Sequence, residues 1–117
     1  NILSGEAVQN GSAGLMLVLS DRQKLRIATE PRAAARNRLQ VAIRPEHIAL
    51  YAATEQPGGE NILRGRIVQR DFLGAHIEYI VEVGDAQLRV MGTKQISGPE
   101  VLVELPVQRC MPFWQDK

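Results

Sequence analysis

The segment that says most about the fold is Val41-Ala42-Ile43-Arg44-Pro45-Glu46-His47-Ile48-Ala49-Leu50. Its first residues alternate between branched apolar and small or polar side chains, the pattern of a half-buried strand. Pro45 has no amide hydrogen to donate and cannot continue a central ladder, so the strand is expected to end at Arg44 or Pro45. Arg44 and Glu46 could form a rigid corner by bonding backbone groups or each other, or they could be two solvated charges on a surface turn.

An internal repeat surrounds this segment at an offset of 60 residues. Asn1-Ile2-Leu3-Ser4-Gly5 recurs as Asn61-Ile62-Leu63-Arg64-Gly65, and Gly14 recurs as Gly74. A glycine that interrupts a strand is typical of a bulge or of a bend where another backbone comes close. The repeat therefore predicts two related halves with the same architecture.

Each half also contains a predicted hairpin. Residues 15–19 are apolar and are followed by a polar turn and an alternating segment that ends at Ile27, while residues 77–83 and 86–90 form the corresponding pair around Gly84-Asp85. Short strands without a helical period predict an all-β fold, namely a small antiparallel OB-like barrel or a pair of such barrels. We expect a first half at 1–53, a Pro-Gly-Gly linker at 54–60, and a second half with a C-terminal tail at 61–117, together forming one compact unit.

Composition narrows the possible functions. Hydrophobic residues make up 44% of the 117 residues but aromatics only 4%, so Ile, Val and Leu must fill the core. The formal charge of +1 supplies no field that would attract nucleic acid or anionic lipid. A single cysteine, Cys110, excludes an internal disulfide and fits a reducing compartment. The chain does not begin with methionine, which suggests a piece excised from a longer protein.

No catalytic or metal-binding motif is present in the sequence. It contains no Gly-x-x-x-x-Gly-Lys-Ser/Thr loop for nucleotide phosphates, so the fragment is not expected to hydrolyse ATP. His47, His76 and Cys110 are not spaced as zinc ligands. Arg64, Arg66 and Arg70 are expected on one face of the strand that begins the second half, but no aromatic residue accompanies them for base stacking, which disfavours a nucleic-acid site.

A family resemblance gives these patterns a function. The Val-Ala-Ile-Arg-Pro-Glu-His-Ile segment resembles the C-terminal region of the ATPase subunits of bacterial ABC importers. Asn61-Ile62-Leu63-Arg64-Gly65-Arg66-Ile67-Val68, with Asp71-Phe72-Leu73-Gly74 after it, resembles the start of the TOBE module of that region. The resemblance implies an accessory domain that holds the ATPase dimer together and takes part in regulation.

The same resemblance implies partners and a location. We expect contacts with an N-terminal ATPase domain of the same chain, with a second copy in a homodimer, and with membrane subunits through the parent protein. ATP and Mg would belong to that parent and not to this fragment, which would lie in the cytoplasm, peripherally at the inner face of the bacterial inner membrane. The transported solute is not encoded here.

The sequence is compatible with two alternative functions. The Asn-Gly strand is shared with tandem molybdate-binding barrels, which resemble TOBE in fold and hold oxyanions with backbone amides, Ser, Thr and Lys. Lys94-Gln95-Ile96-Ser97-Gly98 would be the material for such a site. A nucleic-acid-binding OB module is the less favoured alternative.

The tail suggests an interface. Met111, Phe113 and Trp114 lie within four residues of each other, and we expect them to be covered by their own barrel or by a second copy. The structural or interface residues predicted from the sequence are Arg44, Pro45, Glu46, His47, Asn61, Gly65, Gly74, Phe113 and Trp114.

Overall fold

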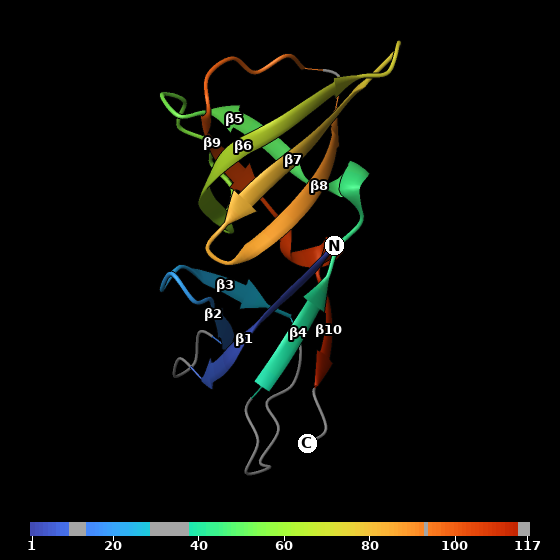
Figure 1. Ribbon diagram of the computed structural model, residues 1–117. Coiled ribbons are helices and arrows are strands. Elements are labelled where there is room, and N and C mark those ends of the chain that lie inside the picture. Colours follow the sequence, from blue (N-terminus) through green and yellow to red (C-terminus); the bar gives the residue numbers. More distant parts are fainter. Residues whose placement is uncertain (10–13, 29–37, 93, 115–117) are drawn as a thin grey trace.

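The computed structural model describes residues 1–9, 14–28, 38–92 and 94–114, which form two five-stranded antiparallel sheets (Figure 1). The strands are β1 (Ile2–Gln9), β2 (Leu15–Val18), β3 (Lys24–Ile27), β4 (Arg38–Ala42), β5 (Ala49–Ala52), β6 (Ile62–Phe72), β7 (Ile77–Val83), β8 (Ala86–Gly92), β9 (Glu100–Glu104) and β10 (Met111–Trp114). Two 3₁₀ turns, η2 (Pro45–His47) and η3 (Val107–Arg109), precede β5 and β10. The all-β prediction is confirmed, and so are both predicted hairpins, β2–β3 and β7–β8.

The two repeats exchange their last strands. One sheet has the order β10-β4-β1-β2-β3 and the other has the order β5-β9-β6-β7-β8. Thus β5, from the first half of the chain, pairs with β9, and β10, from the second half, pairs with β4. Each sheet therefore contains strands from both halves of the chain, because the segment after each 3₁₀ turn crosses into the other sheet.

Alternating burial explains why these segments are strands. Every second residue is buried along β7, and along β1 as far as Ala7, as expected where one face of a sheet packs on a core. The inner faces of both sheets contribute to one hydrophobic cluster, in which Leu, Val and Ile predominate and Tyr79 is the largest fully buried side chain. Burying each such aliphatic side chain contributes roughly 1.5 to 3 kcal/mol.

Strand β6 departs from simple alternation. Its register against β7 shifts between Ile67 and Gln69, which is a β-bulge, and the residues beyond it change face. Past the bulge the β6–β7 hairpin projects away from the sheet (Figure 1). Phe72 lies near its tip and is 63% exposed.

Candidate functional site

The repeated asparagines join the two sheets. Asn61 is buried, and its Oδ1 accepts a hydrogen bond from the Arg26 amide at 2.8 Å while its Nδ2 donates to the Arg26 carbonyl at 3.0 Å. Asn1 makes the same pair of bonds with Arg89, at 2.7 and 2.6 Å. Arg26 lies in β3 and Arg89 in β8, which are edge strands of opposite sheets. Each asparagine therefore supplies a ladder-like pair to an edge strand of the other sheet.

A third amide side chain makes a similar contact. The Gln23 Oε1 accepts from the Arg64 amide at 2.7 Å, and the Gln23 Nε2 donates to the Arg64 carbonyl at 3.0 Å. Asn61 was predicted as a structural residue, whereas Asn1 and Gln23 were not singled out. The repeat itself was the available signal for Asn1, because it occupies the same position as Asn61.

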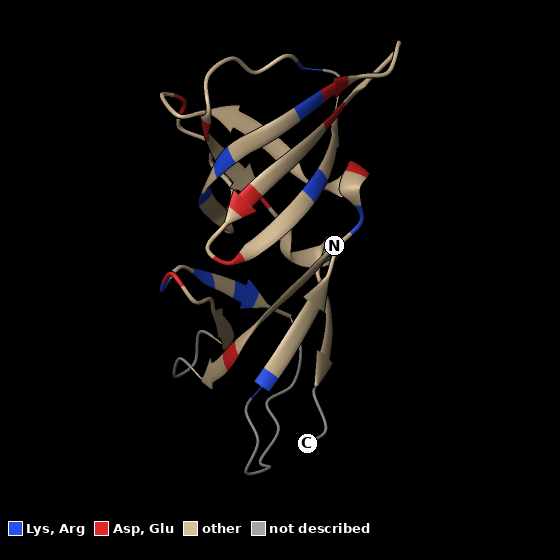
Figure 2. Cartoon of the chain, in the orientation of Figure 1, with Lys and Arg blue, Asp and Glu red and all other residues tan. Residues whose placement is uncertain are grey.

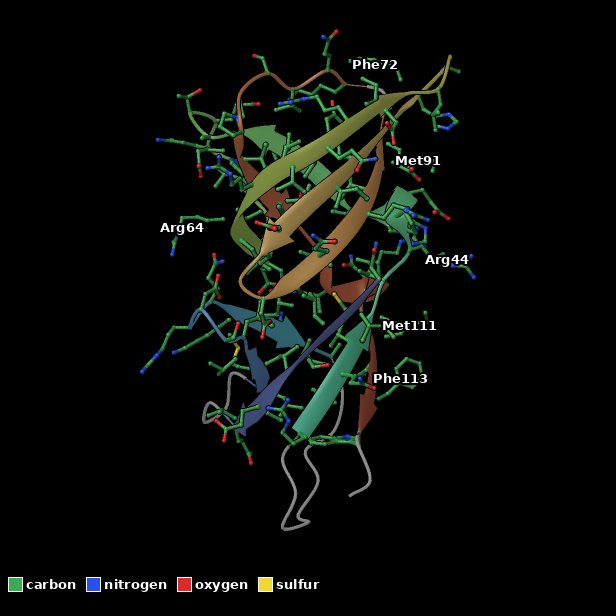
Figure 3. The ribbon with its side chains drawn as sticks, in the orientation of Figure 1. Arg44, Arg64, Phe72, Met91, Met111 and Phe113 are labelled. Atoms are coloured by element: carbon green, nitrogen blue, oxygen red, sulfur yellow. The ribbon has the colours of Figure 1, made fainter. Side chains whose placement is uncertain are left out.

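The Arg-Pro-Glu-His segment forms the corner between the two sheets. The strand ends at Ala42, slightly earlier than expected, and Pro45, Glu46 and His47 form η2 with Pro45 at its start. The Arg44 and Glu46 side chains are exposed, and no ion pair joins them among the described residues. Figure 3 shows Arg44 pointing outward from this corner. Of the two expectations for these charges, the solvated turn is the one observed.

Gly65 and Gly74 have separate structural roles. A Cβ on Gly65 would lie 2.8 Å from Val81 Cγ1, so a glycine is needed where β6 passes close to β7. Gly74 has a φ of 79° in the β6–β7 turn, a conformation that favours glycine. The repeat preserves both features, since Gly5 lies against the Val18 carbonyl and Gly14 has a φ of 100°.

The tail folds onto its own chain but leaves apolar atoms uncovered. Trp114 packs against the core from β10, whereas Phe113 and Met111 remain 55% and 47% exposed. Ile2 and Met111 lie opposite Ala42 from either side, so the outer face of this sheet carries an apolar patch of Ile2, Ala42, Met111 and Phe113. Met111 and Phe113 of this patch are labelled in Figure 3. Of the three apolar tail residues that were expected to be covered, the single copy covers Trp114 only.

The segment that the oxyanion alternative would use, residues 94–98, is engaged within the chain. The Lys94 Nζ lies 3.0 Å from the Glu55 carboxylate, and the Ile96 amide donates to the Tyr79 hydroxyl at 3.0 Å. The carbonyls of Lys94, Ile96 and Gly98 accept hydrogen bonds from Tyr79 or Arg70. A free anion would have to compete with these contacts.

A polar cleft of about 560 Å³ lies where the two sheets meet. Arg22 and Arg38 line it together with the hydroxyl residues Ser4 and Ser20, and the acidic residues Glu6 and Asp85 balance the two positive charges. Arg22 has a φ of 75°, which is uncommon for a non-glycine residue. The Ser20 hydroxyl accepts a hydrogen bond from the Asp85 amide.

A second, more apolar cleft of about 300 Å³ follows the seam between β5 and β8. Its lining includes Leu50 and Tyr51 of β5, Tyr79 of β7, Val90 and Gly92 of β8, and Lys94. The Lys94 Nζ is 5.4 Å from the centre of the Tyr51 ring, a cation–π contact. The Tyr51 hydroxyl donates to Glu104, and this bond raises the Tyr51 pKa, with desolvation adding to the shift. No pattern in the sequence pointed to this cleft.

Among the residues described, no cluster of three or more His, Cys, Asp or Glu could hold a metal ion. The expected basic face is also divided, because the bulge places Arg70 opposite the buried Tyr79, where its guanidinium donates to the Ile96 and Gly98 carbonyls. The grouping of Arg70 with Arg64 and Arg66 was wrong for this reason. Figure 2 shows charges of both signs mixed over both sheets.

Together, the two interlocked halves and the amide clamps between them define an all-β domain of the OB-like type. The chain matches the TOBE domain family over residues 41–111, and it belongs to that family. The fold also matches the crystal structure of the cytoplasmic molybdate-binding protein ModG with molybdate bound, with a TM-score of 0.78. That match covers 98% of this chain and 96% of ModG at 14% sequence identity, a level that establishes the common fold.

Comparison with curated proteins gives no match. In the described part of the chain no helix has the length and apolar character needed to cross a membrane.

Proposed function

We propose that this TOBE domain is the non-catalytic accessory domain of the ATP-binding subunit of an ABC-type solute importer. The observation that carries the proposal is the position of the TOBE match, which begins at Val41 on the strand leading into Arg-Pro-Glu-His. That segment is the one that resembles the ATPase subunits of bacterial importers. The domain would help to hold the ATPase dimer and transmit regulation.

The surface of the domain supports a docking role. The apolar patch of Ile2, Ala42, Met111 and Phe113 lies on the outer face of one sheet, and apolar patches of this kind mark interaction sites. In this proposal the partners are an N-terminal ATPase domain of the same polypeptide, a second copy of the subunit, and the membrane subunits of the importer. The domain would then work at the cytoplasmic face of the membrane.

Oxyanion binding is the second candidate. The fold match to ModG extends over nearly the full length of both chains, and this finding favours the second candidate more directly than the first. The engagement of Lys94 by Glu55 argues against an oxyanion site at residues 94–98. The polar cleft with Arg22, Arg38, Ser4 and Ser20 offers the cations and hydroxyl groups that an oxyanion requires.

Calorimetric titration of the intact chain with MgATP, molybdate and tungstate distinguishes the candidates. The first candidate predicts no saturable heat with any of the three, because the ATP site would lie in another domain. Saturable molybdate or tungstate binding that is lost in the double variant Arg22→Gln, Arg38→Gln and kept in Lys94→Met would replace the first candidate by the second. Saturable ATP binding would contradict both.

A further inference from the structure

The seam between β5 and β8 is where the second sheet fails to close. Both strands are edges of that sheet, and no ladder joins them, although they lie close enough to enclose the apolar cleft between them. An OB-like barrel that closed fully would pair its edge strands here. The backbone groups facing the seam therefore remain to be satisfied by water or by a ligand.

Hydrogen bonds made elsewhere on these strands show which peptide groups face the seam. The Arg89 amide and carbonyl point away from β7 to meet Asn1, so those of Met91, two residues further along β8, point the same way. The Ala52 amide and carbonyl point away from β9 to meet Glu55, so those of Leu50 also point away from β9. The seam thus presents a donor and an acceptor from each strand.

Charged groups of both signs lie at the rim. Lys94 lines the cleft, and its Nζ is 3.0 Å from Glu55, whose carboxylate also accepts the Ala52 amide. Both side chains are partly exposed, 56% for Lys94 and 40% for Glu55, so an incoming ligand could share them. The interior is apolar, with Leu50 and Val90 among its walls.

We propose that this seam cleft binds a free α-amino acid with an apolar side chain. The ligand carboxylate would pair with Lys94 and a seam amide, its ammonium group with Glu55 and a seam carbonyl, and its side chain would fill the apolar interior. A volume of about 300 Å³ is at the lower end for ligand pockets, which suits a molecule of this size. This inference does not depend on the proposed accessory role, because it concerns a different surface from the docking patch.

Titration of the intact chain with L-leucine and L-phenylalanine, followed by calorimetry and by NMR shifts of the tyrosine rings, tests the proposal. We expect saturable binding and shifts of the Tyr51 and Tyr79 signals. Lys94→Met should weaken binding about three- to tenfold, the loss expected for one partly exposed charge-assisted hydrogen bond. 4-Methylpentanoate, which lacks the ammonium group, and N-acetyl-leucinamide, which lacks both charges, should bind more weakly than L-leucine.

A matched pair of glycine variants locates the site. A Cβ on Gly92 meets nothing within 4 Å, so Gly92→Leu should fill the cleft without disturbing the strand and should abolish binding. Gly58 is equally unobstructed but lies in the linker, so Gly58→Leu should leave binding unchanged. Circular dichroism and melting temperature check that both variants fold.

Three results would overturn the proposal. The first is that neither amino acid saturates the protein up to about 10 mM, because a dissociation constant above that concentration is too weak for specific recognition. The second is unchanged binding in a folded Gly92→Leu variant. The third is binding of 4-methylpentanoate or N-acetyl-leucinamide as tight as that of L-leucine, which would mean that the charges of the ligand are not recognised.

Discussion

The asparagine that opens each repeat acts as a clamp between the two sheets. The sequence marked Asn61 because its motif recurs, but it could not give the reason, since Asn61 and Arg26 are 35 residues apart and Asn1 and Arg89 are 88 apart. Long-range pairs of this kind leave no periodic signal. The contact of Lys94 with Glu55 left no such signal either, because the two residues are 39 positions apart.

Replacing Asn61 should be costly. Asn61→Ala removes two hydrogen bonds at a buried site and leaves the Arg26 peptide group without its partner, so we expect a loss of about 2 to 3 kcal/mol in the free energy of unfolding. Asn1→Ala removes an equivalent pair at a less buried position and should cost clearly less. Urea unfolding of both variants measures the difference, and equal losses would show that burial does not determine the strength of the clamp.

The thiol of Cys110 should be inert in the folded protein. Burial raises its pKa to about 11, and the Sγ donates weakly to the Leu105 and Pro106 carbonyls. Reaction with an aromatic disulfide reagent at pH 8 should therefore be slow until the chain unfolds, because the thiolate is the reactive form.

The shifted pKa of Cys110 also predicts how stability depends on pH. The folded thiol holds its proton more tightly than the unfolded one. Its contribution to the free energy of unfolding is therefore fully present below the unfolded pKa, near 9, and is lost as pH rises through about 11. The free energy of unfolding should fall over that range in the wild type, and less steeply in Cys110→Ala. Parallel curves for the two proteins would contradict the assignment.

Among the secondary-structure elements, the two hairpins and the Pro45 corner could be predicted from local sequence patterns. The exchange of strands between the sheets and the bulge in β6 could not. Alternation identified β2–β3 and β7–β8, and Pro45 identified the turn. Nothing local indicates that β5 pairs with β9 and β10 with β4, because those partners are chosen by tertiary packing. The extra residue in β6 has no sequence signature either, and it reverses the face on which Arg70 lies.

The close passage of β6 and β7 gives a prediction at this scale. Gly65→Ala places a methyl group 2.8 Å from Val81 Cγ1 and should destabilise the fold by about 1 to 3 kcal/mol through overpacking. Gly58→Ala, in the linker with open space around it, should be neutral or slightly stabilising. Thermal unfolding of the pair provides the measurement, and a neutral Gly65→Ala would show that the two strands can move apart.

For the whole molecule, exchange of strands makes the halves interdependent. Each sheet takes its last strand from the other repeat, and one hydrophobic cluster spans both, so the intact chain should unfold in a single cooperative transition. A fragment of residues 1–60 would lack β10 and the partner sheet and should not fold. Two separate calorimetric transitions, or a folded fragment, would show that the halves are independent domains.

The sequence indicated the family of the domain but not the position of its clefts. The Arg-Pro-Glu-His segment and the Asn-Gly repeat indicated a TOBE module, and the family match confirms that part of the interpretation. The clefts arise from sheet edges and inter-sheet contacts, which exist only in the folded chain.

An accessory role beside an ATPase can be tested by identifying the polypeptide that carries this domain in its own cells. Antibodies raised against the domain would be used to isolate the native protein, and its peptides would be identified by mass spectrometry. The accessory role predicts a polypeptide much heavier than the 13.0 kDa of this chain, with a Gly-x-x-x-x-Gly-Lys-Ser/Thr peptide in the segment before Asn1. A polypeptide of about 13 kDa with no such peptide would contradict the claim.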